Sequence, residues 1–179
     1  FIESISGTGL TAIVSIILAN ILAPEQFGLV GMVAIFVTLG NSLMDSGFSG
    51  ALIRKSDVTD KDLSTVFYTN LALGAGIYAI LYAISPWVAS FLGYEILTKL
   101  LRVLSLSVII VSFTQVQKVN FIRKIDFKTQ AIISLIAAVT SGVASIWMAL
   151  TGWGVWALVA QQLSKQAMIS ILLWVFSSW

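Results

Sequence analysis

Long apolar segments, separated by short polar connections, run through the whole chain and constrain its fold more than any other feature. A helix needs about 20 mostly apolar residues to cross the hydrocarbon core of a bilayer, and it satisfies its own backbone hydrogen bonds. Six segments meet this requirement: residues 1–22, 27–44, 63–92, 100–116, 129–150 and 154–176. We therefore predict an all-α, polytopic bundle of about six transmembrane helices that forms one domain over residues 1–179.

The composition supports a membrane location and argues against several other classes of protein. Apolar residues make up 58% of the chain and charged residues 10%, whereas soluble domains carry roughly 25% charged residues. The absence of cysteine and histidine removes disulfides, thiolate chemistry and the commonest zinc ligand. The sequence also has no glycine-rich phosphate loop and no serine in a nucleophile elbow. We expect no catalytic residue, no metal site, no cofactor and no nucleic-acid partner.

Local signals mark the breaks between the segments. Pro24 ends the first helix, because proline disfavours a helical residue before it and lacks an N–H donor. Thr59 and Asp62 have the spacing of a capping box at the start of the third helix. Gly152 and Gly154 predict a turn before the sixth helix, and Pro86 predicts a bend or an early end in the long third segment.

Basic residues in the short loops indicate the orientation of the bundle. The second-to-third loop contains three lysines and arginines and the fourth-to-fifth loop contains four, seven together, against two in the third-to-fourth connection on the opposite side. Cytoplasmic loops of membrane proteins are enriched in these residues. We therefore predict a cytoplasmic amino terminus. The chain starts at Phe1, inside an apolar run and without an initiator methionine, so we expect it to be a fragment.

Two stripes of small residues predict faces where helix backbones come close, because packing in lipid depends on close approach. One stripe lies in the third segment and one in the fifth. They comprise Ala75, Ala79 and Ala83, and Ala137, Ser141, Ser145 and Ala149.

A polar strip in the sixth segment is the first candidate for a functional site. Lys165 lies near the middle of this segment, where a charge costs about 2.5–3.5 kcal/mol on insertion scales. Gln161 stands one turn earlier on the same face, with Gln162 beside it. We predict that this strip faces the bundle interior or a watery cavity, where Lys165 attracts an anionic part of a cargo. Snorkelling of the lysine to an interface, without a specific role, is the alternative.

Other polar residues are further candidates for a substrate pathway. Asn41 and Asp45 lie one turn apart at the cytoplasmic end of the second segment, and Asn70 lies in the third. A coupling role for the carboxylate competes with simple hydration at an interface. For Asn70 the alternative is an ordinary hydrogen bond between helices.

The basic loop from 118 to 128 mixes charges with apolar side chains, a pattern able to lie on an anionic inner leaflet at about 1 kcal/mol per basic residue. Positive-inside bias explains the same residues equally well. The candidates for contact with lipid headgroups are Lys118, Arg123, Lys124 and Lys128.

Several stretches resemble the polysaccharide-export branch of the multidrug/oligosaccharidyl-lipid/polysaccharide flippase superfamily, which includes Wzx-type flippases. Residues 18–28, LANILAPEQFG, are similar to the signature that ends the family's first helix, with Asn20 where arginine is usual. Residues 45–53, DSGFSGALI, followed by 62–67, DLSTVF, are similar to its second inner loop. Residues 152–159, GWGVWALV, are similar to its fifth-to-sixth turn.

The resemblance implies an amino-terminal lobe of a two-lobed transporter in the bacterial inner membrane. Such a protein moves a polyprenyl-linked glycan for cell-surface polysaccharide synthesis by alternating access between its lobes. The implied partners are this substrate, membrane lipids, the carboxy-terminal lobe, and a polysaccharide polymerase or glycosyltransferases. Two alternatives stay open. An ion-coupled multidrug exporter needs an acid in the cavity, for which Asp45 and Glu3 are the candidates, and a nontransporting scaffold for glycosyltransferases needs no mid-membrane lysine.

Overall fold

A computed structural model describes residues 2–45, 59–123 and 127–176, and every regular element within these ranges is a helix. The helices are α1 (Ile2–Ile21), α2 (Pro24–Asp45), α4 (Asp60–Leu92), α5 (Ile96–Leu104), α6 (Leu106–Arg123), α7 (Phe127–Leu150) and α8 (Val155–Phe176). The predicted all-α bundle is therefore confirmed.

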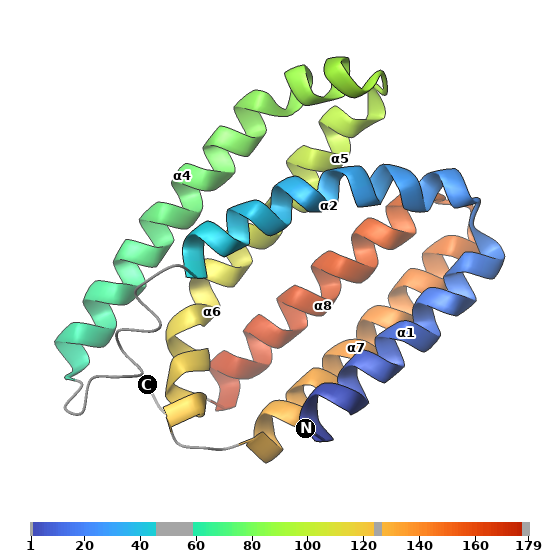
Figure 1. The fold of residues 1–179 in the computed structure, drawn as a ribbon. Helices are drawn as coiled ribbons and strands as arrows, with labels where there is room; N and C mark the ends of the chain where they lie inside the picture. The colour runs from blue at the N-terminus through green and yellow to red at the C-terminus, as the bar shows by residue number, and fades with distance from the viewer. Residues whose placement is uncertain (1, 46–58, 124–126, 177–179) are drawn as a thin grey trace.

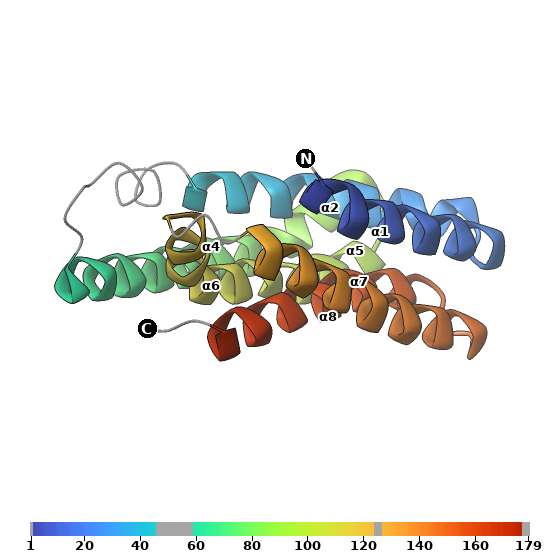
Figure 2. The same ribbon diagram turned by 90° about the horizontal axis from the view of Figure 1, so that it is seen from below.

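α1, α4, α7 and α8 run in roughly the same direction, and α2 crosses the bundle at an angle to them (Figure 1). α7 packs against both α1 and α8, α6 packs against α4 and α8, and α2 contacts α4, α5, α6 and α8. Figure 2 shows α1 and α2 on one side of the bundle and α8 on the other. α1 and α2 meet at their connection and diverge from it, so that α8 is visible between them in Figure 1.

Four helices within the described ranges are long and apolar enough to cross a membrane, which makes the chain a multi-pass membrane bundle. They are Pro24–Met44, Lys61–Leu92, Ile96–Val119 and Lys128–Leu150, and a shorter apolar helix covers Gly9–Ile21. α8 matches the sixth predicted segment in position but is not among the four. Three glutamines and Lys165 interrupt the apolar sequence of α8.

The fourth predicted segment, 100–116, corresponds to two helices with a break at Ser105. α5 is amphipathic, since it buries four leucines completely while Lys99 stays exposed. These leucines, at 97, 100, 101 and 104, join Val33 and Val37 of α2 in the largest apolar cluster of the bundle. The segment therefore begins earlier than predicted, because leucines at helical spacing extend its buried face back to Leu97.

Three predicted helix boundaries are confirmed. The Thr59 hydroxyl accepts from the Asp62 backbone N–H at 3.3 Å, and an Asp62 carboxylate oxygen accepts from the Thr59 N–H at 3.0 Å, which completes the capping box. Gly152 and Gly154 both have positive φ in the turn before α8, as the sequence predicts. Pro24 follows the end of α1 and is itself the first residue of α2, a position that tolerates the missing donor.

Pro86 does not shorten α4, which continues to Leu92. Proline cannot donate to the carbonyl four residues earlier, so it leaves the Tyr82 carbonyl without its helical partner. The Ser85 hydroxyl donates to that carbonyl at 2.8 Å. Arg102 of α5 then donates from Nε to Ser85 Oγ at 2.9 Å, and its guanidinium lies 4.2 Å from the centroid of the Tyr82 ring. Side chains thus replace the lost backbone bond and tie α4 to α5.

The two small-residue stripes have different surroundings. Ala137, Ser141, Ser145 and Ala149 of α7 are all buried. Beside them, a Cβ added to Gly142 would lie 2.7 Å from Val14 Cγ2, so α1 and α7 approach closely here. Ala75, Ala79 and Ala83 of α4 are instead exposed. The contact face of α4 is displaced by one residue and includes Gly74, where an added Cβ would lie 2.7 Å from Ser112 Cβ.

Candidate functional site

Lys165 is half-buried near the middle of α8 and points toward α1. Its ammonium donates a hydrogen bond to Thr11 Oγ1 at 2.8 Å, joining residues 154 positions apart in the sequence. A charge at this depth needs a polar environment. The hydroxyl of Thr11 supplies part of it, and the lysine side chain lies against α1.

A pocket of about 400 Å³ surrounds this contact. Its walls come from α1, α2 and α8, at the place where α1 and α2 diverge over α8 (Figure 1). The lining residues are Thr11, Ser15, Phe27, Val30, Gly31, Leu158, Gln161, Gln162 and Lys165. The structure thus brings together the three predicted residues of the polar strip and adds hydroxyl groups from a second helix.

The polar groups of this pocket suit an anion or a hydroxyl-rich ligand. Lys165 contributes a positive charge and three donors, and the two glutamines contribute amide donors and acceptors. Thr11 and Ser15 contribute hydroxyls. The pocket lining contains no carboxylate. Phe27, Val30 and Leu158 form the apolar remainder, a mixture of few polar groups on an apolar wall that is typical of ligand sites.

Thr11 and Ser15 are the site residues that the sequence did not single out. They lie four positions apart, and therefore on one face of α1, in an otherwise apolar stretch. Threonine and serine are common in membrane helices, where their hydroxyls often bond the backbone of the preceding turn. The i, i+4 spacing of two hydroxyls was the available signal, and only the fold connects it with Lys165.

Asn41 and Asn70 do not line this pocket. Asn70 is only 1% exposed on α4 and Asn41 is half-buried on α2. Within the described residues, Asn41 Oδ1 and both amide atoms of Asn70 are buried without a hydrogen-bond partner. Both amide atoms of Gln117 on α6 are likewise buried without a partner among these residues. The structure therefore separates these amides from the Lys165 strip, and their predicted place in a pathway stays a prediction.

The remaining candidates are either exposed near helix ends or have side chains that the structure does not describe. Asp45 and Arg123 are the last residues of α2 and α6, but their side chains fall outside the described part, as do Lys124 and the side chain of Glu3. Lys118 and Lys128 are both exposed, near the end of α6 and the start of α7. No group of three or more acidic or histidine ligands occurs in the portion of the chain that the structure describes.

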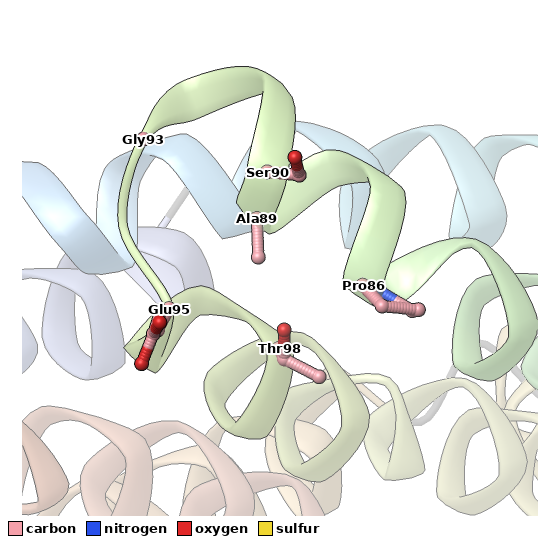
Figure 3. A pocket seen from close by; sticks show the side chains of 6 residues that line it. All are labelled: Pro86, Ala89, Ser90, Gly93, Glu95 and Thr98. Atoms are coloured by element: carbon pink, nitrogen blue, oxygen red, sulfur yellow. The ribbon is translucent and has the colours of Figure 1, made fainter.

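A second pocket, of about 460 Å³, lies between α4 and α5 at the connection of these two helices. It is lined by Pro86, Ala89, Ser90, Gly93, Glu95 and Thr98, and Figure 3 shows Ala89 of α4 pointing toward Thr98 of α5. Glu95 is its one charged group and is exposed. This pocket has no buried charge, so the Lys165 pocket is the stronger candidate for specific binding.

Sequence comparisons place these features in a family. The sequence pattern of the family described as "Polysaccharide biosynthesis protein" matches residues 17–179. The succinoglycan biosynthesis transport protein ExoT of Rhizobium meliloti (strain 1021) is 30% identical over 153 residues, covering 86% of this chain and 31% of that protein. The teichuronic acid biosynthesis protein TuaB of Bacillus subtilis (strain 168) is 31% identical over 99 residues, 55% of this chain and 20% of TuaB.

A third relative is the lipopolysaccharide biosynthesis protein WzxC of Escherichia coli (strain K12), 24% identical over 119 residues, which are 66% of this chain and 24% of WzxC. The chain thus spans between about a fifth and a third of the length of these relatives. No solved structure matches it. The family pattern covers α2 and α8 and the end of α1, and the chain belongs to the polysaccharide biosynthesis protein family.

Proposed function

We propose that the complete protein is a transporter, and not an enzyme, that flips lipid-linked oligosaccharide units across the bacterial cytoplasmic membrane for the synthesis of a cell-surface polysaccharide. The relatives support this class of cargo, since one is named as a transport protein and all three are named for polysaccharide or lipopolysaccharide biosynthesis. In this proposal the chain is one lobe of a two-lobed transporter, and the second lobe lies in the part of the protein outside this chain.

The observation that carries the proposal is the cationic pocket at the divergence of α1 and α2. A polyprenyl-linked glycan presents a diphosphate and many hydroxyls, and the pocket offers an ammonium, two amides and two hydroxyls. The Lys165 ammonium would attract the diphosphate as a point charge. A site within the bundle, reached from one side at a time, is what alternating access requires.

The proposed orientation follows from the basic loops. With the amino terminus in the cytoplasm, α1 and α2 diverge toward the cytoplasmic face, where the lipid-linked glycan is assembled. The cargo would enter between these helices, reach Lys165, and leave on the outer side when the lobes rock. The carboxy-terminal lobe, glycosyltransferases and a polysaccharide polymerase are the partners that this cycle implies.

The lining of the pocket favours this cargo over the positively charged compounds that an ion-coupled drug exporter would carry. A cationic drug or a coupling ion needs an acidic group, and none of the nine lining residues is acidic. A scaffold without transport activity would have no use for the part-buried contact between Lys165 and Thr11, which must offset the cost of a charge inside the membrane.

The test is deletion of the complete gene in its native bacterium, with measurement of polyprenyl-linked glycan at the inner leaflet and of polysaccharide at the surface. Flipping predicts that carrier-linked glycan accumulates, that surface polymer is lost, and that the wild-type gene restores both. Unchanged levels of both would reject the proposal and favour a drug exporter or a scaffold.

A further inference from the structure

A second cationic pocket lies at the end of the bundle where α6 ends and α7 begins, away from the Lys165 site. It has a volume of about 140 Å³ and is lined by Lys118, Gln130, Ser134, Ile133, Ile169 and Leu173. Since small-molecule sites usually have about 300–1,000 Å³, this pocket is too small for a glycan. It has room for a compact group such as a phosphate.

Each polar residue that lines this pocket offers a hydrogen-bond donor. Lys118 contributes an ammonium from α6, while Gln130 and Ser134, one turn apart on α7, contribute an amide and a hydroxyl. The Gln130 amide nitrogen is buried and has no hydrogen-bond partner within the described part of the chain. A buried donor without a partner is unfavourable, so a ligand with acceptor oxygens would stabilise the pocket.

The rest of the lining is apolar. Ile133 and Leu173 are buried, and Ile169 packs against them between α7 and α8. Three of the six lining residues are therefore apolar. Polar donors beside these apolar side chains suit an anionic headgroup that is attached to acyl chains, whereas a free anion would gain nothing from the apolar part.

We propose that the Lys118–Gln130–Ser134 pocket binds the phosphate of an anionic membrane phospholipid. Lys118 attracts the negative charge, and Gln130 and Ser134 donate hydrogen bonds to the phosphate oxygens. The apolar part of the lipid next to the headgroup lies against Ile133, Ile169 and Leu173. The bound lipid holds α6, α7 and α8 together at this end of the bundle. This site does not depend on the proposed transport function.

Lys128 provides a matched control, because it is an exposed lysine at the same end of the bundle but does not line the pocket. The full-length protein in detergent is titrated with phosphatidylglycerol, with phosphatidylcholine of the same acyl chains, or with inorganic phosphate, and its melting temperature is followed. Wild type, Lys118→Gln, Lys118→Arg, Gln130→Leu and Lys128→Gln are compared. Variants are first checked for a single monodisperse species without added lipid.

We expect phosphatidylglycerol to raise the melting temperature of wild type and phosphatidylcholine to raise it much less. Lys118→Gln and Gln130→Leu should weaken the apparent affinity for phosphatidylglycerol at least tenfold, while Lys118→Arg and Lys128→Gln stay near wild type. Equal losses in Lys118→Gln and Lys128→Gln would overturn the proposal in favour of a diffuse positive surface. Equal stabilisation by both lipids, or by inorganic phosphate alone, would overturn the assignment of an anionic phospholipid.

Discussion

Lys165 and Arg102 are both basic residues at contacts between apolar helices, but their surroundings differ. The Arg102 side chain bonds to Ser85, stacks over Tyr82 and completes the hydrogen bonding around Pro86. Lys165 bonds to one hydroxyl and lies beside a pocket of about 400 Å³. A cation that supports the hydrogen bonding around Pro86 stabilises the fold, whereas a cation beside an open polar pocket is available to a ligand.

Replacing Lys165 should give the largest effect on transport. Lys165→Ala removes the only charge among the pocket residues, so we expect transport of the lipid-linked glycan by the full-length protein to fall at least tenfold, on the order of 1.4 kcal/mol. Membrane insertion should stay normal or improve, because a charge has been removed from an apolar helix. The measurement is flipping in proteoliposomes, normalised to the amount of inserted protein.

Replacing Arg102 should lower the stability of the protein and leave its transport activity intact. Arg102→Ala removes a charge-assisted hydrogen bond and a cation–π contact, so we expect stability in detergent to fall by about 1–2 kcal/mol while transport per folded molecule stays near wild type. Thermal unfolding and proteoliposome flipping are measured on the same preparation. A transport defect as large as that of Lys165→Ala, in folded protein, would remove the distinction between the two cations.

The Thr11 hydroxyl offers a further test of the comparison between Lys165 and Arg102, since it accepts a hydrogen bond from the Lys165 ammonium. Thr11→Val keeps the shape of the side chain and removes the acceptor, so we expect transport to fall severalfold, on the order of 1 kcal/mol. Thr140→Val is the matched control, because the Thr140 hydroxyl bonds carbonyls of its own helix. Equal transport in the two variants would show that the contact between α1 and α8 has no role in binding.

The glutamines should give the smallest effects. Gln161→Leu or Gln162→Leu removes one amide from the pocket. We expect each to weaken binding of the lipid-linked glycan by about 0.5–1 kcal/mol and to lower transport accordingly. Gln166→Leu changes a half-buried glutamine of α8 outside the pocket and should leave transport unchanged. Apparent affinity for the lipid-linked glycan is the quantity to compare. Effects of equal size at all three positions would indicate a general response to the polarity of α8.

Much of the fold followed from local chemistry in the sequence. Hydrophobic segments gave the positions of the helices, and Thr59, Asp62 and Gly152 gave boundaries that local hydrogen bonding and backbone freedom decide. The continuation of α4 through Pro86 did not follow, because the Ser85 hydroxyl replaces the missing backbone donor and is itself held by Arg102 of another helix. The burial of one small-residue stripe and the exposure of the other also depend on which helices are neighbours.

Local chemistry also made part of the Lys165 site predictable from the sequence. The cost of a charge in lipid singled out Lys165, and helical spacing added Gln161. Thr11 and Ser15 could not be connected to them, because nothing in a single sequence states that the Lys165 side chain of α8 reaches Thr11 of α1. Long-range packing decides which of several polar residues share a pocket.

The measurement that tests the account most directly is flipping of a polyprenyl-linked glycan by the full-length protein in proteoliposomes, with wild type, Lys165→Ala and Arg102→Ala compared at equal amounts of folded, inserted protein. The account predicts that wild type and Arg102→Ala flip at similar rates and that Lys165→Ala is at least tenfold slower. Flipping by Lys165→Ala at the wild-type rate would contradict the assignment of the Lys165 pocket to the cargo.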